Sequence, residues 1–157
     1  MRKVGVILRI RPCVLIERDS KILFMTYDYS KGRLYALPGG GQEKGETLAE
    51  TAVREMREEC AVEVELGPLL WVCEMEAQGG IPETLHLVFS GKISERAQPR
   101  LQPRHTTASG LCWLSAEELT DKSLYPHIVG TIQKEYFLHK SDPKGAYIGR
   151  CPQRPWV

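Results

Sequence analysis

The chain has 157 residues, of which 42% are hydrophobic and 26% are charged, with 21 Lys and Arg against 20 Asp and Glu. This length suits one domain and leaves little room for a second. The hydrophobic fraction excludes a disordered chain, and a formal net charge of +1 provides no overall field to attract nucleic acid or an anionic membrane. Composition therefore predicts a single globular domain that binds neither nucleic acid nor membrane.

Targeting and cysteine patterns indicate the cytoplasm. The longest apolar runs, at residues 4–8 and 69–73, fall well short of the roughly 18–20 residues that span a bilayer. Arg9 and Arg11 interrupt the N-terminal apolar stretch before a signal-peptide core of about 7–15 residues is complete. The cysteines are odd in number and form no Cys-x-x-Cys pair. We therefore expect a cytoplasmic protein with buried free thiols.

The N-terminal part of the chain reads as strands followed by a glycine loop. Residues 4–17 are rich in β-branched side chains and end at a polar turn, so we expect a hairpin with the apolar run that begins at Ile22. Pro12 has no amide hydrogen to donate, and we expect it at a sheet edge or a bulge. The apolar residues 34–37 then lead into Pro38 and three successive glycines, where the backbone can approach another group closely.

Residues 47–60 carry the strongest helix signal in the chain. Ala, Leu, Met, Glu and Arg dominate this segment, which contains neither Pro nor Gly. At about 100° per residue its apolar side chains form one arc, which we expect to face the core. That arc consists of Leu48, Ala49, Ala52, Val53, Met56 and Cys60. Glu55, Glu58 and Glu59 crowd together from the edge of the arc, because residues three and four apart lie on neighbouring turns.

The second half of the chain mixes strands with weaker helix signals. Three strands are predicted from alternating apolar residues, at residues 62–76, 84–93 and 111–114. A capping pattern at residues 115–118 predicts a short helix, and residues 124–138 predict a final helix weakened by Pro126 and Gly130. Because regular βαβ alternation is missing, the element order predicts an α+β fold with a mixed sheet and helices packed on it.

The three crowded carboxylates give the clearest chemical signal. Like charges at helical spacing repel by a few tenths of a kcal/mol per pair unless a cation intervenes. Hard oxygen ligands on one face suit Mg²⁺ or Mn²⁺, and Mg²⁺ usually takes one or two carboxylates while it keeps waters and substrate phosphates. The glycine loop upstream could offer a carbonyl to the metal or amides to the phosphates. A solvated helix face with no such role is the alternative, because charge runs usually mean exposure.

The spacing of residues in the segment 40–62 narrows these alternatives. With one exception, the segment follows a fixed pattern. A glycine is followed after five residues by a glutamate, and after seven more residues by Arg-Glu-apolar-any-Glu-Glu-any-Gly-apolar. The matching residues are Gly40, Glu46, Arg54, Glu55, Met56, Glu58, Glu59 and Val62. This pattern closely resembles the signature of the Nudix hydrolase family. The exception is Ala61 in place of the late glycine, which costs about 1 kcal/mol if the backbone there needs a positive φ.

The resemblance implies a fold, a reaction and a cofactor. The element order is similar to the family's α/β/α sandwich, so we expect one Nudix domain over residues 1–140 and a C-terminal tail of unknown structure over residues 141–157. The implied enzyme is a pyrophosphohydrolase that cleaves the diphosphate linkage of a nucleoside diphosphate joined to another moiety, by attack of water on phosphorus. The implied cofactor is Mg²⁺, with Mn²⁺ as a substitute. The implied partner is a small-molecule nucleotide, and a homodimer is compatible with the family.

The resemblance also implies roles for individual residues. The implied metal ligands are the carboxylates of Glu55, Glu58 and Glu59 and the carbonyl of Gly39. Glu58 would alternatively act as a base. Arg54 would orient the carboxylates through a charge-assisted hydrogen bond, with Glu46 as its partner or as an outer ligand. Changes at Arg54 or Glu46 should therefore cause milder defects than changes at the ligands.

The catalytic base outside the signature is left open. Related enzymes often carry an acidic residue on the loop before the last strand, but residues 100–110 contain no carboxylate. His105 on this loop could act as a base, because histidine titrates near neutral pH, and it could equally be an exposed loop residue. The other candidates are Glu74, Glu76, Glu83 and Glu95, or Glu58 acting alone.

Substrate contacts are predicted from the residues before the glycine loop. Tyr27, Tyr29 and Tyr35 could stack on a base and Arg33 could pair with phosphate, while packing of the tyrosines on a sheet surface is the alternative. The signature is compatible with ADP-ribose and other nucleoside diphosphate sugars, dinucleoside polyphosphates, and ordinary or oxidised nucleoside triphosphates. The alternative function is a nucleotide-binding Nudix module without turnover that acts as a sensor or regulator, which the mutually repelling carboxylates disfavour.

Overall fold

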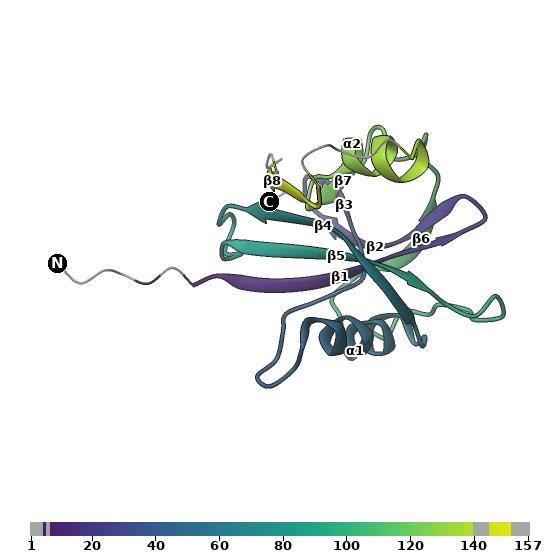
Figure 1. The fold of residues 1–157 in the computed structure, drawn as a ribbon, viewed down its shortest axis with the longest axis horizontal. Coiled ribbons are helices and arrows are strands. Elements are labelled where there is room, and N and C mark those ends of the chain that lie inside the picture. Colours follow the sequence, from purple (N-terminus) through teal and green to yellow (C-terminus); the bar gives the residue numbers. More distant parts are fainter. Residues whose placement is uncertain (1–4, 6, 140–144, 152–157) are drawn as a thin grey trace.

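The computed structural model describes residues 5, 7–139 and 145–151, whose elements are arranged as Figure 1 shows. The strands of this part of the chain are β1 (Arg9–Arg18), β2 (Lys21–Tyr29), β3 (Gly32–Ala36), β4 (Glu65–Met75), β5 (Thr84–Lys92), β6 (Gly110–Leu114), β7 (Ser123–Tyr125) and β8 (Tyr147–Arg150). The helical elements are α1 (Leu48–Cys60), α2 (Val129–Thr131) and the π-helix η1 (Ile132–Phe137). Among the described helices, none is long and apolar enough to cross a membrane.

One mixed sheet forms the middle layer. Its strands follow the order β7-β3-β2-β1-β5-β4-β8, and β6 pairs with β2 off this path. The pairs β1·β5, β3·β7 and β4·β8 are parallel, and the other pairs are antiparallel. In Figure 1, α1 lies on one side of the sheet, and α2 with η1 lies on the other. The predicted sandwich with a mixed sheet and helices packed on it is therefore confirmed.

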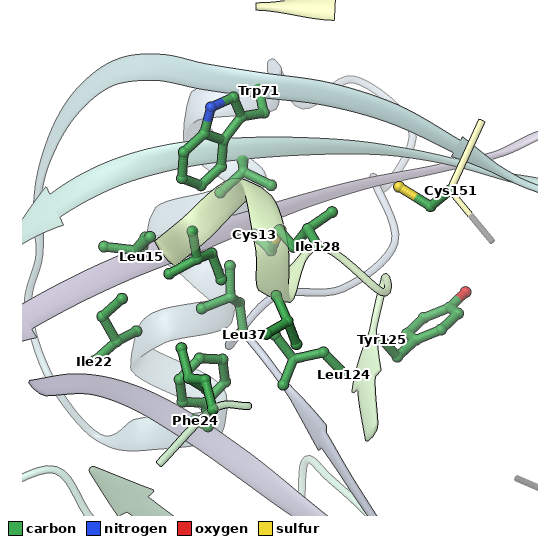
Figure 2. Close-up of a cluster of buried hydrophobic side chains, with 14 of the residues drawn as sticks. Cys13, Leu15, Ile22, Phe24, Leu37, Trp71, Leu124, Tyr125, Ile128 and Cys151 are labelled. Carbon is green, nitrogen blue, oxygen red and sulfur yellow. The ribbon is translucent and has the colours of Figure 1, made fainter. Parts of the chain in front are cut away.

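Two hydrophobic cores fill the space between these layers. The larger core lies between the sheet and the C-terminal helical segment, and Figure 2 shows part of it around Phe24, Leu37 and Trp71. The indole Nε1 of Trp71 donates to Glu135 Oε2 at 2.7 Å, so η1 is tied to β4 by a polar bond as well as by packing. The smaller core lies under α1 and includes Met56.

β1 separates from β2 along most of its length, and the glycine loop lies beside it there. Only the last two residues of β1 pair with β2. Further upstream, Val14 N donates to the Pro38 carbonyl at 2.9 Å, and Gln42 N donates to the Ile10 carbonyl at 3.1 Å. At Pro12, β1 pairs with β5 on one side and lies beside the glycine loop, instead of β2, on the other, so Pro12 stands at a local edge of strand pairing as expected. Pro12 is tolerated because, like Ile10 and Val14, it turns its backbone nitrogen toward the loop and away from β5.

Two predicted helices differ in the structure. Residues 124–138 do not form one helix, because Leu124 and Tyr125 belong to β7 and pair with β3, and helical structure begins only at Val129. Pro126 explains the boundary, since it disfavours helical backbone at the residue before it. Residues 115–118 make the expected reciprocal bonds between backbone and side chains but form a turn, because a capping box alone does not stabilise a helix this short.

The remaining elements agree with the sequence. The predicted hairpin is β1 and β2, and the three later strands are β4, β5 and β6, although β1 begins at Arg9. All five cysteines are free, as expected, and Cys112 alone among them is only partly buried. The boundary expected near residue 140 falls among residues 140–144, outside the described residues. Beyond it, β8 pairs with β4 and adds a strand to the sheet.

Candidate active site

α1 is fixed at both ends by its own sequence. Thr47 is the N-cap: its hydroxyl accepts from Glu50 N at 3.2 Å, and its own N–H donates to the Glu50 carboxylate at 2.7 Å. At the other end Ala61 adopts a left-handed conformation with φ 55° and ψ 37°, and its N–H donates to the Arg57 carbonyl at 3.1 Å. The position of the late signature glycine is therefore a C-cap, where alanine costs about 1 kcal/mol.

α1 turns two of its carboxylates inward. Glu55 is only 9% exposed and Glu59 only 6% exposed. The expected apolar arc is partly wrong, because Leu48 is half-buried and Ala49 is exposed. The buried face of α1 comprises Thr51, Ala52, Glu55, Met56, Glu59 and Cys60. The space beside β1 that the glycine loop occupies accommodates these carboxylates, so burial on this helix does not follow hydrophobicity alone.

The glycine loop packs directly against the inward carboxylates. Gly39 N donates to Glu59 Oε2 at 2.9 Å. A Cβ on Gly40 would lie 2.2 Å from Glu55 Oε1, and a Cβ on Gly39 would lie 2.3 Å from the Pro12 carbonyl oxygen. Both distances are too short for any side chain, so the loop needs glycine at these two positions to approach the helix and β1.

Arg54 connects the acidic residues of the signature. Its Nη1 donates to Glu55 Oε1 at 2.9 Å and to Glu58 Oε2 at 3.0 Å. Its Nε and Nη2 donate to the Glu46 carboxylate at 2.7 and 3.1 Å, and Nη2 also donates to the Gly41 carbonyl at 3.1 Å. One guanidinium therefore holds three carboxylates in fixed orientations through charge-assisted bonds. This geometry is consistent with the orienting role that the signature implies.

The charges at the site are unevenly balanced. Burial raises the pKa of Glu59 to about 7, and it also raises the pKa of Glu55 although Arg54 opposes the shift. The hydrogen bond from Arg54 instead lowers the pKa of Glu46 to about 2. Ionised Glu55 and Glu59 are thus undercompensated by the protein itself. Such carboxylates gain more from a bound cation than solvated ones do.

Glu55 and Glu59 line a cavity of about 570 Å³. We call the surface made by Gly39, Gly40, Glu55 and Glu59 the carboxylate side of the cavity. The rest of the lining, here called the arginine–tyrosine side, contains three arginines, three tyrosines and the loop 103–107. Those arginines and tyrosines are Arg9, Arg11, Arg104, Tyr27, Tyr29 and Tyr125. The cavity therefore offers metal-binding groups together with cationic and aromatic groups.

The structure brings two of the four predicted substrate contacts to the cavity, Tyr27 and Tyr29. Arg33 lies outside the lining and pairs with Asp28, with Nε 2.6 Å from Oδ1. Tyr35 also lies outside the lining, because side chains alternate along β3 and its two neighbours in the strand are the ones that reach the cavity.

The candidate bases are distributed unevenly as well. Among the candidates outside the signature, His105 lines the cavity. Glu74 accepts from the Tyr147 hydroxyl at 3.0 Å, and Glu76 pairs with Arg150 at the far edge of the sheet. Glu58 is bonded to Arg54 and is absent from the lining. Geometry therefore separates His105 from the acidic alternatives.

Sequence reasoning missed Arg11, Thr106 and Tyr125. Arg11 is buried and donates through Nη2 to the Gly39 carbonyl at 2.8 Å, and Thr106 and Tyr125 line the same cavity. A charged residue at an inward position of an apolar strand is a signal that could have identified Arg11. Thr106 and Tyr125 have no comparable signal, because their roles depend on contacts between segments far apart in the chain.

Comparison with known families shows what kind of protein carries this site. A family model described as NUDIX domain matches residues 3–134. The chain belongs to the Nudix hydrolase family. The match spans every residue of the carboxylate side and the loop 103–107, and it confirms the resemblance inferred from the signature.

Curated relatives of this Nudix chain match it at low identity. The NAD-capped RNA hydrolase NudC of Vibrio atlanticus is 27% identical over 140 residues, which cover 85% of this chain and 46% of the relative. The putative 8-oxo-dGTP diphosphatase 3 of Mycobacterium tuberculosis is 23% identical over 124 residues, which cover 79% of this chain and 55% of the relative. The chain thus spans about half the length of these relatives.

Solved structures share the fold. The MutT protein from Methanosarcina mazei Go1 superposes with a TM-score of 0.70 at 18% identity, covering 88% of this chain and 100% of the other. A NUDIX hydrolase from Nitrosomonas europaea gives a TM-score of 0.68 at 18% identity, covering 93% and 79%. At these identities the likeness establishes the fold alone.

The Nudix family implies a divalent cation, and the donor groups present here fit one. Within the described residues, no group of three or more His, Cys, Asp or Glu side chains is arranged to hold a metal ion by itself. Two undercompensated carboxylates, Glu55 and Glu59, nevertheless line one cavity with Gly39. The Gly39 carbonyl accepts from Arg11 and has a second lone pair. Two carboxylates and a carbonyl, completed by waters and phosphate, suit Mg²⁺.

Proposed function

We propose that this Nudix protein is a Mg²⁺-dependent pyrophosphohydrolase acting on the diphosphate linkage of a nucleoside diphosphate joined to another moiety. The observation that carries the proposal is the meeting of Glu55 and Glu59 with the glycine loop at a cavity that also holds three arginines. An anionic diphosphate repels a nucleophile, so a site that surrounds it with cations favours attack on phosphorus. Family membership supports the same class of reaction.

The residues of the carboxylate side would divide the work. Glu55, Glu59 and the Gly39 carbonyl would hold the cation, with Mn²⁺ able to substitute for Mg²⁺. When bound, the metal neutralises the phosphates, templates their geometry and lowers the pKa of a coordinated water. Arg54 holds Glu55 in place, and Glu46 in turn holds Arg54 through two hydrogen bonds. Both positioning residues act through the ligands, so their loss is expected to be the milder one.

For the base that accepts a proton from the attacking water, we propose His105. Its side chain lines the cavity and is exposed, so a water can contact both the imidazole and a bound phosphate. Glu58, the alternative base and a further proposed ligand, would first have to leave Arg54, to which it is bonded at 3.0 Å. The accessible position of His105 favours it.

The substrate is proposed to be a nucleotide whose base stacks on the tyrosines. Tyr27 and Tyr29 line the cavity and offer aromatic faces, whereas Arg33 and Tyr35 could act only at its periphery. The candidate classes are nucleoside diphosphate sugars such as ADP-ribose, dinucleoside polyphosphates, and ordinary or oxidised nucleoside triphosphates. The expectation that no nucleic acid is bound does not fit relatives named for NAD-capped RNA, and we do not retain it.

A phosphate-release screen coupled to a phosphatase tests the proposal. The protein would be assayed with and without Mg²⁺ against the candidate classes and an NAD-capped RNA. We expect metal-dependent turnover of at least one class, and the class turned over would identify the leaving group. If no class were turned over while the same ligands raised the melting temperature, the protein would be a nucleotide-binding module that acts as a sensor or regulator.

We also propose a cytoplasmic location, and either a monomer or a homodimer. The five free cysteines support a reducing, cytoplasmic location. A homodimer is the expected alternative to a monomer, and light scattering of the purified protein would distinguish the two.

A further inference from the structure

Arg11 is a buried cation whose Nη1 has no hydrogen-bond partner. The residue as a whole is only 4% exposed. Its Nη2 donates to the carbonyls of Leu37 at 3.0 Å and Gly39 at 2.8 Å, whereas Nη1 is buried without a hydrogen-bond partner. Within the described residues, no ion pair includes Arg11. The charge of Glu59 stabilises the guanidinium without a direct ion pair and raises the pKa of Arg11 against its burial, so the unpartnered Nη1 is the part of the group that still lacks an acceptor.

The neighbours of Arg11 leave Nη1 without an acceptor. The Tyr125 ring lies on one side, with its centroid 5.9 Å from Arg11 Cζ, at cation–π distance. His86 stands opposite Arg11 in the register of β1 and β5, and neither of its ring nitrogens has a partner. The site thus contains several unsatisfied polar atoms, and Arg11 is the one among them that lines the cavity.

The position of Arg11 indicates which part of a ligand it meets. Gly39 N donates to Glu59 Oε2 at 2.9 Å, and the Gly39 carbonyl accepts from Arg11 Nη2 at 2.8 Å. Gly39 therefore bonds both Arg11 and the proposed metal ligand Glu59, and all three residues line one cavity. Arg9, two positions earlier on the same face of β1, also lines that cavity. A group that reaches both the carboxylate side and these guanidinium groups must be anionic, because a base or an uncharged ribose carries no compensating charge.

We propose that Arg11 Nη1 donates to a non-bridging phosphoryl oxygen of the bound substrate, which makes Arg11 a specificity-determining residue for a diphosphate. This inference rests on the proposed function and names the chemical group that the site recognises. Because Nη2 remains on Gly39, the same guanidinium joins the phosphate to the loop that carries a proposed metal ligand. Lysine keeps the charge but lacks the rigid fork that makes both sets of bonds.

Binding of methylenediphosphonate, which cannot be hydrolysed at its bridging carbon, tests the inference. Calorimetric titrations in Mg²⁺ would compare wild type with Arg11→Gln, Arg11→Lys and Arg96→Gln, the last of which removes the same charge from an exposed residue. We expect Arg11→Gln to weaken binding at least tenfold, Arg11→Lys to weaken it less, and Arg96→Gln to change it less than twofold. Unchanged affinity in Arg11→Gln would overturn the inference.

Two further measurements separate recognition from a structural role. If Arg11 only clamps the loop, Arg11→Gln will weaken the binding of Mg²⁺ alone by the same factor as it weakens the diphosphonate, and this result would also overturn the inference. If Arg11→Gln does not fold, NMR of the wild-type protein labelled with ¹⁵N-arginine tests whether Arg11 contacts the ligand. The Arg11 guanidinium resonance, assigned by its loss in Arg11→Lys, must then shift when methylenediphosphonate is added.

These experiments do not depend on turnover. An Arg11-dependent affinity in a protein that turns over no substrate would retain the inference and overturn only the proposed hydrolysis. Turnover without any Arg11-dependent affinity would do the reverse.

Discussion

The two sides of the cavity are built in different ways. The carboxylate side comes from residues 39–59, a single stretch in which the groups bond one another: Arg54 holds Glu55, and Gly39 donates to Glu59. The arginine–tyrosine side is assembled from segments far apart in the chain, including β1, β2, the loop 103–107 and β7. The first side is a local unit, whereas the second exists only when the whole domain has folded.

This difference separates chemistry from selectivity. A local, mutually bonded unit can serve any substrate that contains a diphosphate, so changes in it should affect all substrates alike. Segments that meet only in the folded domain can vary one at a time, and such segments usually determine which ligand is accepted.

The largest expected effect is on the carboxylate side. Glu59→Gln should lower turnover by about 10²–10³-fold or more for every substrate, because a charged group that stabilises the reacting phosphate is lost whatever the leaving group. The measurement is kcat/KM across the substrate screen. Glu63→Gln is the matched control, since Glu63 is exposed and pairs only with Arg57. A loss confined to one substrate would place Glu59 in recognition.

The same residue predicts a pH effect on stability. The pKa of Glu59 is raised from 4.5 to about 7. Its ionisation therefore costs the folded state nothing below pH 4.5, progressively more up to pH 7, and at most about 3 kcal/mol above that. Glu59→Gln should thus raise the melting temperature of the metal-free protein at pH 8, and the gain should shrink at pH 5. Melting in EDTA at both pH values tests this, and a lower melting temperature at pH 8 would contradict it.

His105 lies on the arginine–tyrosine side but is proposed as the base, so it tests whether the chemistry is confined to the carboxylate side. His105→Gln should lower kcat by about 10²-fold, because the proton acceptor is lost. The melting temperature should not change, since the side chain is exposed. If kcat stayed as in wild type, the loop 103–107 would serve selectivity alone, and Glu58 would become the proposed base.

Gly40→Ala tests whether close approach of the glycine loop matters for catalysis. The added Cβ would lie 2.2 Å from Glu55 Oε1, so Glu55 or the loop must move. We expect weaker Mg²⁺ binding and kcat/KM lower by about 10–100-fold, the range seen when a metal ligand is displaced slightly. Gly130→Ala is the control, because nothing lies within 4 Å of its added Cβ. Equal kinetics for the two variants would show that Glu55 does not depend on the loop.

The smallest expected effect leaves both sides of the cavity unchanged. Ala61→Gly should stabilise the protein by about 1 kcal/mol, because glycine adopts the left-handed C-cap conformation without the steric cost that alanine has there. Denaturant unfolding measures this gain, with kcat/KM as the accompanying readout. A destabilised variant would mean that the greater flexibility of the unfolded glycine outweighs the relief of strain.

Particular residues show how far the sequence could be interpreted. The limits of α1 were predictable because its capping box and its left-handed end are made by residues within four positions of one another. The bonds that Arg54 makes to Glu46 and Glu55 were likewise predictable, because the Nudix signature fixes the spacing of these residues. By contrast, Leu124 and Tyr125 lie in a strand where a helix was expected, because their partners in β3 are about 90 residues away.

Local periodicity and fixed spacing suffice to place side chains on one helix face, so the family, the layered mixed-sheet fold and the carboxylate cluster follow from the order of residues. The burial of Glu55 and Glu59, the position of Arg33 and Tyr35 outside the cavity, and the position of Arg11 and His105 on it emerge only in the folded domain. These outcomes depend on which distant segments pack together. That packing reflects long-range burial and pairing, which a local pattern of residues does not contain.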